Sequence, residues 1–444
     1  MNNQTSTKEY INKLIEFRQA VYEHGMIRRR DALFDLLDAL VASGTVLSFA
    51  FLSQSAQFRR KWPSLYAAVE DGRLDSLWLR DYLARQVPGT GVQHFALDGS
   101  PWPRPRARTL DDRQYVYQAS SDVNGGTIAV GYPYSLLEWV TQAHTSWSLP
   151  VDARRVSSAQ TAQEVGAEQI RTFAQARATW STALDVVACD GKYGNCGFLR
   201  SVRGLPVGIV ARLRCDRVLY LAAPLPNGKR GRPRVHGASF AFKDPGTWPD
   251  PDEMIALQDP LWGQVCLERW NELHEKKGAD VPYAVLRVRV HLEREKPPAA
   301  LWLAWLAPAE KILPLEGIWR AYEHRWPIEP SLHFRKETLG WTQPKFQSKE
   351  AGDRWTELTV LATWIVFLAR PVVLDKPLPW QKPQTQLTPQ RVQQSLPSIF
   401  VLIGSPAGPP KSRGIPPGWT KGRSRARKPR LPVVKKTLSA AKTA

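Results

Sequence analysis

The stretch Y-E-H-R-W-P-I-E-P-S-L-H-F-R-K, residues 322–336, decides how the rest of the chain is interpreted. It combines a carboxylate with two cations and a phenol, at Tyr322, Arg325, Glu329 and Lys336. At about 100° per residue, Glu329 and Lys336 share one face of an α-helix. An acid within a basic face is suited to hold a metal ion against phosphate groups. An ordinary amphipathic helix with ion pairs between turns is the alternative for this stretch alone.

Two prolines limit where this helix can begin. Pro327 and Pro330 cannot lie in a helix interior without the loss of hydrogen bonds, but proline is common in a first turn. We therefore predict that the helix begins near Pro327 and that Glu329 lies in or near its first turn. Tyr322 and Arg325 then precede the helix, so the single-face argument does not extend to them.

The composition indicates a soluble globular protein with a polyanionic partner. Of the 444 residues, 43% are hydrophobic and 23% are charged, and no apolar run reaches the roughly 18 residues of a membrane span. The N-terminal residues lack the pattern of a signal peptide. Four scattered cysteines have no paired metal spacing, which favours reduced thiols in the cytoplasm. The net charge of +20 and the pI near 9.9 favour nucleic acid as the partner, with no membrane involved.

Two aspartates lie at the ends of predicted strands. The run H-F-A-L-D ends at Asp98 before Gly-Ser, and the run D-V-V-A-C-D ends at Asp190 before glycine. Between these runs the pattern predicts strands at 113–119, 127–130 and 134–140 and then a helix at 161–179. Strand, hairpin, helix and strand are the beginning of a ribonuclease-H-like α/β domain. In that fold the first strand and a later neighbouring strand each carry a carboxylate, and Asp98 and Asp190 are placed for these roles.

Each aspartate also has a simpler interpretation. Aspartate before glycine at a strand end is frequently only a turn residue. Asp111, Asp112 and Asp185 compete for the same roles, although Asp111 and Asp112 precede a strand and Asp185 begins the strand that Asp190 ends.

The spacing Tyr322-x2-Arg325-x3-Glu329-x6-Lys336 resembles the Y-R-E-K signature of a large group of bacterial insertion-sequence DDE transposases. The motif D-G-x-Y-G-N at 190–195 is also similar to the sequence that follows the second aspartate in this group. The resemblance covers roughly 95–368 and is densest in the signature.

This resemblance implies a catalytic triad of Asp98, Asp190 and Glu329 that binds two Mg²⁺ ions, for which Mn²⁺ can substitute. It implies DNA cleavage at transposon ends and strand transfer into target DNA. The implied partners are double-stranded DNA, as terminal inverted repeats and as target, and a second copy of the chain in a homodimer on DNA. The implied location is the cytoplasm, with the nucleoid. Phosphate or DNA contacts are implied for Tyr322, Arg325 and Lys336.

The predicted fold class is α/β, with five segments along the chain. The strands predicted after Asp190 lie at 207–214, 218–223, 283–290 and 300–306, with loops between Pro224 and Pro260. Beyond Asp375 there is no acidic residue, which is typical of a disordered cationic tail. The segments are an α-helical, DNA-binding N-terminal domain at 1–90, the first part of a ribonuclease-H-like catalytic core at 91–205, a β-rich insertion at 206–310, the second part of the core at 311–372, and a Pro-rich, basic and largely disordered tail at 373–444.

The predicted insertion contains K-R-G-R-P-R at 229–234. R-G-R-P is the core of the AT-hook, an extended segment that lays arginines along a narrow minor groove. Arg230 and Arg232 are therefore candidate DNA contacts. A solvated basic loop that touches phosphates without specificity is the alternative.

Two other functions remain open at this point. The chain could be another ribonuclease-H-like nuclease, or a catalytically inactive DNA-binding protein derived from a transposase. The signature cations and the long insertion argue against the first, and the intact set of three acids argues against the second.

Overall fold

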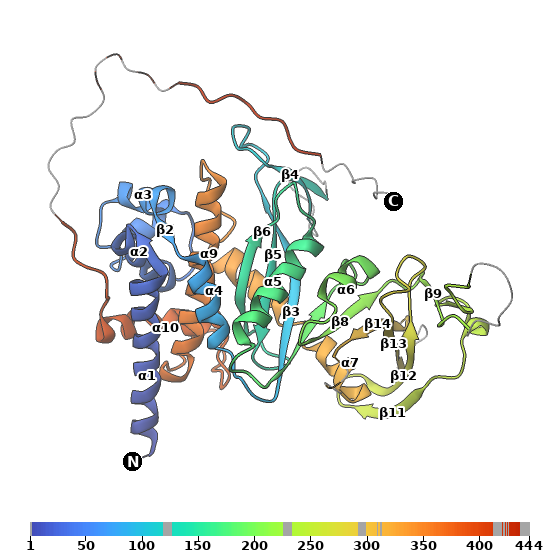
Figure 1. Cartoon of the computed structure of the whole chain (residues 1–444). Helices are drawn as coiled ribbons and strands as arrows, with labels where there is room; N and C mark the ends of the chain where they lie inside the picture. The colour runs from blue at the N-terminus through green and yellow to red at the C-terminus, as the bar shows by residue number, and fades with distance from the viewer. Residues whose placement is uncertain are drawn as a thin grey trace.

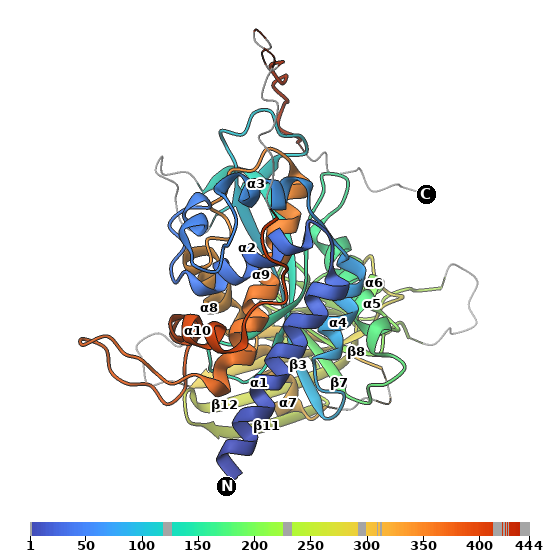
Figure 2. The ribbon, with the colours of Figure 1, turned by 90° about the vertical axis from the view of Figure 1, so that its left-hand side faces the viewer.

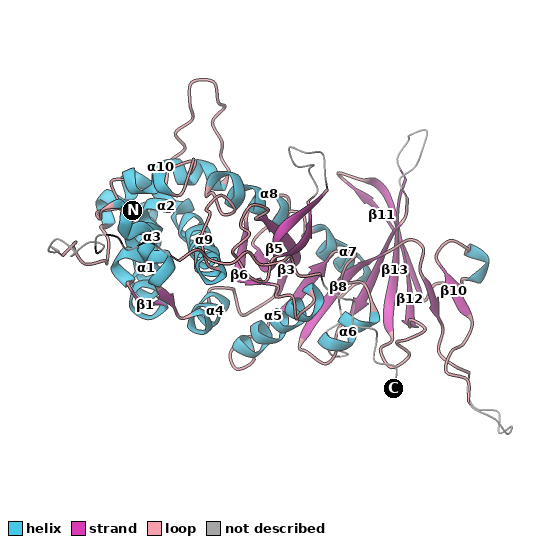
Figure 3. Ribbon diagram, turned by 90° about the horizontal axis from the view of Figure 1, so that it is seen from above, coloured by secondary structure: helices cyan, strands magenta, loops and turns pink. Residues whose placement is uncertain are grey.

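The computed structural model describes residues 2–118, 127–224, 233–291, 299–308, 310, 313–411, 420, 422, 424 and 426–435. Its centre is a mixed ten-stranded sheet in the order β11-β12-β13-β14-β8-β7-β3-β5-β4, with β6 paired to β5. Helices gather at one end of this sheet, and the strand-rich region extends away from them at the other end (Figures 1 and 3). The chain is therefore a mixed α/β protein, as its sequence predicts.

Five strands form the middle of the sheet. β3 pairs with β5 in antiparallel and with β7 in parallel orientation, β5 pairs with β6, and β8 continues the sheet in parallel to β7. This order and these directions agree with the ribonuclease-H-like prediction. The bounds are β3 Val92–Pro103, β5 Ile128–Val140, β6 Ser148–Arg155, β7 Leu184–Cys189 and β8 Val207–Leu213.

β7 is a parallel strand buried on both faces. Its residues Val186, Val187, Ala188 and Cys189 are each at most 1% exposed, which explains the unbroken apolar run in the sequence. Helix α5 (Ala162–Arg177) precedes it and begins with a capping box between Thr161 and Glu164. Helix α6 (Cys196–Val202) then leads to β8.

The predicted insertion continues the central sheet instead of standing apart from it. β14 (Leu301–Leu306) pairs antiparallel with β8, and β13, β12 and β11 follow outward in antiparallel order. β8 itself was assigned to the insertion, but its parallel pairing with β7 makes it part of the core sheet. The remaining bounds are β11 Glu253–Asp259, β12 Gly263–Leu273, β13 Tyr283–His291, and the separate pair β9 Val218–Tyr220 and β10 Ser239–Ala241 with the 3₁₀ turn Pro245–Thr247.

A layer of helices covers the opposite end of the sheet, and α9 (Lys349–Ala369) is its centre. α9 contacts α1, α2, α3 and α10 as well as strand β6, and Figure 2 shows α1 crossing in front of it. Its Trp355, Leu358, Leu361 and Ile365 are completely buried, so the apolar run near 356–369 lies in a helix that packs against the other elements on every side. The other helices are α1 Asn2–Ala20, α2 Arg30–Ala42, α3 Trp62–Asp71, α4 Ser76–Arg85 and α10 Pro389–Ile403.

Short elements connect these helices and strands. The described ones are the π-helical turn Val21–Gly25, the strand pair β1 Met26–Arg28 and β2 Arg73–Leu74, the 3₁₀ turns Ala50–Gln54 and Arg370–Val372, and β4 Gln114–Tyr117. Within the described ranges, no helix is both long and apolar enough to cross a membrane.

Part of the segment 373–444, which was predicted to be a largely disordered tail, is instead a packed helix. Residues 389–403 form α10, which buries Val392, Leu396 and Phe400 at helical spacing against α2 and α9. Beyond this helix, the Gly408 N–H donates to Asp31 Oδ1 at 2.9 Å. The apolar residues at every fourth position explain the difference, because they give this Pro-rich stretch a face to bury.

Candidate functional site

Asp98 and Asp190 lie side by side where β3 and β7 meet. The register pairs Leu97 with Cys189, so the two aspartates are the next residues along two parallel strands. Asp98 does not end its strand as predicted, because β3 continues to Pro103. The two side chains are 17% and 26% exposed, which leaves both reachable from one side of the sheet. The sheet therefore brings together two acids that are distant in sequence.

The surroundings of Asp98 disfavour its charged form. Burial is the largest influence and raises the pKa of the Asp98 carboxyl, and the nearby Asp190 raises it further. Arg325 and a hydrogen bond from the Gly99 N–H lower it, but the net shift is upward. Two carboxylates this close are stabilised by a cation between or beside them.

Arg325 supplies such a cation in this structure. Its Nη1 lies 3.0 Å from Asp98 Oδ2, and its Nη2 lies 3.4 Å from Glu329 Oε1. Burial lowers the pKa of the Arg325 guanidinium, but Asp98, Tyr322 and Glu329 outweigh this and raise it. One guanidinium thus joins the first and third predicted acids.

The signature stretch begins its helix at the predicted place. Helix α7 (Leu315–Glu323) carries Tyr322, a short turn carries Arg325, and α8 (Ile328–His333) follows Pro327. Glu329 lies in the first turn of α8, as the prolines predict. Lys336 lies in the π-helical turn Phe334–Thr338 that continues α8.

Lys336 and Tyr322 are half-buried beside the same acids. Burial lowers the pKa of the Lys336 amine, as does Arg335, whereas Asp98 raises it. Burial raises the pKa of the Tyr322 phenol, and a hydrogen bond with Arg325 opposes this. Both groups are close enough to feel the charges of the site, so four signature side chains gather beside Asp98 and Asp190.

A buried ion pair that the sequence did not predict holds the signature helix to the sheet. Arg335 pairs with Glu138 of β5, and both side chains are at most 1% exposed. The hydroxyl of Ser148 in β6 donates to Glu138. The backbone carbonyl of Ser148 accepts a hydrogen bond from the Ser331 hydroxyl at 3.0 Å. The signal in the sequence was a lone glutamate in the apolar run that became β5.

The acids are not gathered into a preformed metal site. In the part of the chain that the structure describes, no group of three His, Cys, Asp or Glu side chains is close enough to hold an ion. The donor chemistry of Asp98, Asp190 and Glu329 nevertheless fits a hard divalent cation, because all three supply carboxylate oxygens. Glu329 is 59% exposed, so its side chain has room to turn toward the aspartates.

An apolar cavity of about 650 Å³ adjoins Glu329 and its partner Arg325. Arg325, Glu329 and Tyr322 line one side of it, and the sheet strands and helix α7 supply its apolar wall. The wall residues are Trp262, Val288, Val290, Leu301, Trp319 and Trp326.

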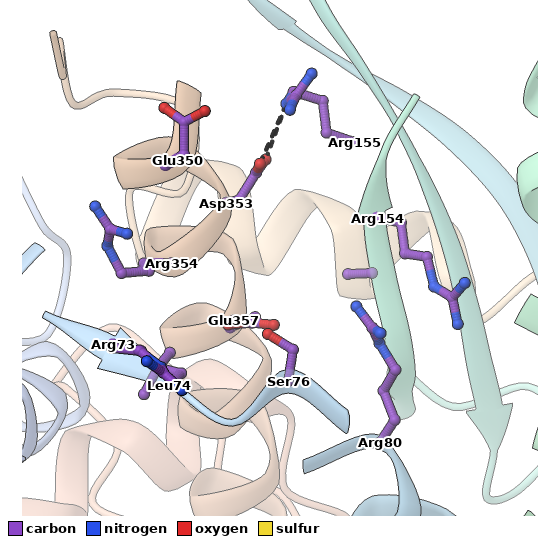
Figure 4. Close-up of a pocket in the computed structure, with 11 residues that line it drawn as sticks. Arg73, Leu74, Ser76, Arg80, Arg154, Arg155, Glu350, Asp353, Arg354 and Glu357 are labelled. Atoms are coloured by element: carbon purple, nitrogen blue, oxygen red, sulfur yellow. Dashed lines mark hydrogen bonds and ion pairs between the residues drawn. The ribbon is translucent and has the colours of Figure 1, made fainter. Parts of the chain in front are cut away.

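A second cavity, of about 370 Å³, lies between the helical layer and β6 (Figure 4). Its acids Glu350, Asp353 and Glu357 come from α9. Burial raises the pKa of Glu357 to about 7, although a hydrogen bond with Ser76 acts in the opposite direction. Burial also raises the pKa of Asp353, and its neighbour Arg155 lowers it. The arginines that face these acids are Arg73, Arg80, Arg154, Arg155 and Arg354.

The competing aspartates have other partners. Asp111 pairs with Lys349, Asp112 pairs with Arg155 at 2.8 Å, and Asp185 pairs with Arg177 at 2.9 Å. The candidate DNA contacts Arg230 and Arg232 lie outside the described residues.

One comparison with known proteins identifies the family of the chain. A family model described as DDE superfamily endonuclease matches residues 23–266, more than half of the chain, and includes Asp98 and Asp190 but not Glu329. No curated protein matches the chain. A chain of the cryo-EM structure of a piggyBac transposase synaptic complex with hairpin DNA is similar at 10% identity and a TM-score of 0.40, over 90% of this chain and 80% of that one. By the family match, the chain belongs to the DDE superfamily endonucleases.

Proposed function

We propose that this chain is a DNA transposase of the group that carries the Y-R-E-K signature in bacterial insertion sequences. The observation that carries the proposal is the arrangement around Arg325. The register of β3 and β7 sets Asp98 beside Asp190, and Arg325 joins Asp98 to Glu329. Its partners would be double-stranded DNA, as terminal repeats and as target, and a second copy of the chain.

Asp98, Asp190 and Glu329 are the residues that would hold divalent metal, with Mg²⁺ proposed and Mn²⁺ as a substitute. Bound ions would activate the attacking oxygen and stabilise the leaving oxygen of a phosphodiester. In this structure, Arg325 balances part of the negative charge that such ions would balance.

The cations of the signature would position the DNA strand. Arg325 and Lys336 offer N–H donors to phosphate oxygens, and Tyr322 offers a hydroxyl. In the first step, a water oxygen would attack phosphorus, and the bond to the 3′ oxygen would break and leave a 3′-hydroxyl. In the second step, that hydroxyl would attack a phosphodiester of the target strand and expel a new 3′-hydroxyl.

A cleavage assay tests the proposal. Wild type and Glu329→Gln are incubated with DNA that carries the terminal sequences of the element encoding the chain, with Mg²⁺ or with EDTA. We expect cleavage by wild type in Mg²⁺ only and a loss of at least about a thousandfold in Glu329→Gln, with DNA affinity retained.

Glu168→Gln is the matched control. Glu168 is also an exposed helical glutamate paired with an arginine, Arg171, and should behave as wild type. DNA binding without cleavage by wild type would instead favour the inactive DNA-binding protein. Cleavage without any preference for the terminal sequences would favour another nuclease.

A further inference from the structure

The turn between β11 and β12 is tied to helix α7 by a closed ring of polar contacts. Asp259, only 3% exposed, accepts the N–H groups of Leu261 and Trp262 at 2.7 Å and so shapes the turn. Its other oxygen lies 2.5 Å from Arg320 Nη1 on α7. The turn and the helix are thus joined by a charged pair with one nearly buried member.

The ring closes through the last residue of α7. Arg320 Nη1 also lies 2.9 Å from Glu323 Oε2, and Glu323 Oε1 accepts the indole N–H of Trp262 at 2.5 Å. Asp259, Arg320, Glu323 and Trp262 therefore form a continuous circuit between the outer strands and the signature stretch. Charge-assisted hydrogen bonds of this kind hold geometry more strongly than neutral ones.

Residues at the end of α7 and just beyond it contact both the β11–β12 turn and the candidate site. Arg320 and Glu323 hold the β11–β12 turn, while Tyr322 hydrogen-bonds with Arg325, which lies just beyond α7 and pairs with Asp98. The Arg325 backbone N–H donates to the Tyr322 carbonyl at 3.1 Å, so a shift at the end of α7 moves Arg325 directly.

The turn also covers the apolar cavity beside the acids. Leu261 and Trp262 line it from the turn, while Trp319 lines it from α7 and Glu329 from α8. Loosening the turn would therefore open the cavity and release the end of α7 together.

We propose that Asp259, Trp262, Arg320 and Glu323 are positioning residues, which hold Arg325 at the acids by docking the β11–β12 turn onto α7. The inference rests on the proposed function and extends it, because it makes the outer strands part of the site. The four positioning residues act through Arg325 and need no contact with DNA.

Two conservative variants test this inference in the full-length chain. Trp262→Phe removes the indole N–H and keeps an aromatic ring against the cavity. Glu323→Gln keeps the shape of the side chain and removes its charge. For each variant we expect the cleavage rate at saturating DNA to fall by about 10- to 100-fold, because small displacements of positioning groups are costly. The DNA concentration at half-maximal rate should not change.

Hydrogen–deuterium exchange gives a readout that does not depend on activity. In both variants, amides of the turn at 259–263 and of α7 at 315–323 should exchange faster together, because each region loses the other's support. If only the turn exchanges faster, the two are not coupled and the inference is overturned.

Matched controls come from the same region. Trp248 also donates its indole N–H, to the Ala241 carbonyl at 2.6 Å, but does not touch α7. Glu316 lies 3.3 Å from Arg320 on the exposed side, one turn earlier. Trp248→Phe and Glu316→Gln should keep the wild-type rate and the wild-type exchange of α7.

The outcomes separate this inference from the proposed function. An unchanged rate in both variants, or weaker DNA binding with an unchanged saturated rate, overturns the positioning role while the transposase proposal stands. If wild type cleaves no DNA, the proposed function falls, and the exchange experiment still decides whether the turn supports α7.

Discussion

Two groups of carboxylates in this chain lie beside basic side chains, and they differ in how their charges are matched. In the candidate site, Arg325 contacts Asp98 and Glu329, Asp190 has Lys192 at 3.8 Å, and the neighbouring cavity wall is aromatic and aliphatic. On α9, Glu350, Asp353 and Glu357 face five arginines, and the lining is mostly charged. In the described part of the chain, the cations near the first group are one arginine and the lysines Lys192 and Lys336, whereas five arginines face the three acids of the second.

This difference indicates which group is suited to bind something further. Carboxylates contacted by a single arginine leave more charge for an added cation to balance, whereas carboxylates matched by several arginines mainly hold helices and strands together. Closeness of acids alone would not separate the two, but their partners do.

The largest expected effect comes from replacing one aspartate in each group by asparagine. Asp98→Asn should reduce Mg²⁺-dependent DNA cleavage by about a thousandfold or more, because it removes a proposed metal ligand. Asp353→Asn should leave cleavage within about threefold of wild type and instead lower the unfolding midpoint, because Asp353 ties α9 to Arg155 and Tyr134. Cleavage rates and urea unfolding of both variants check this. A severe loss of cleavage in Asp353→Asn would break the comparison.

The next effect concerns the buried pair below the candidate site. Arg335→Met should destabilise the fold by about 3–5 kcal/mol, because Glu138 would stay buried without its cation. Urea unfolding measures this, and the double variant Glu138→Gln with Arg335→Met should recover part of the loss. The exposed pair of Arg171 and Glu168 provides a control, since Arg171→Met should cost at most about 1 kcal/mol. If Arg335→Met and Arg171→Met lowered the free energy of unfolding equally, the structural role of Arg335 would be contradicted.

A smaller effect is expected for Lys336. Lys336→Ala removes a proposed phosphate contact and leaves all three acids in place, so cleavage should fall by about 10- to 100-fold. The loss should be smaller at high salt, where salt screens the contact that the variant lacks. Cleavage rates at two salt concentrations measure it. A loss as large as that of Asp98→Asn would mean that Lys336 acts in the chemical step itself.

The smallest effect is a pH dependence of stability from the α9 group. The folded chain raises the pKa of Glu357 from 4.5 to about 7, so it binds this proton more tightly than the unfolded chain does. The free energy of unfolding should therefore decrease as the pH rises from about 4.5 to about 7. Unfolding in urea at several pH values should show a weaker decrease in Glu357→Gln than in wild type. The exposed Glu350→Gln serves as the control, and identical pH curves for wild type and Glu357→Gln would refute the assignment.

The sequence predicted the parts of the site that depend on local chemistry. Pro327 predicted where the signature helix begins, and the apolar run before Asp190 predicted a buried strand. The pairing of Arg335 with Glu138 joins residues 197 positions apart, and no local pattern contains that information. β6 was missed because Ser148–Arg155 contains a proline and ends in polar residues.

The outer strands and α10 show a second reason for missed elements. β11 alternates half-buried and exposed residues, so its pattern is too weak to stand out from a loop. α10 contains Pro397, which argued against a helix, but the spacing of Val392, Leu396 and Phe400 was the stronger signal.

The ion pair between Asp98 and Arg325 also has a consequence for the synthesis of the protein. The two residues are 227 positions apart, and contacts over such distances form slowly because a long loop must close first. A growing chain can complete β3 and β7 well before α7, α8 and α9 leave the ribosome. The two aspartates would then meet early, without the arginine that balances them. The carboxylate site therefore reaches its final form only after the residues of α7 and α8 have been synthesised.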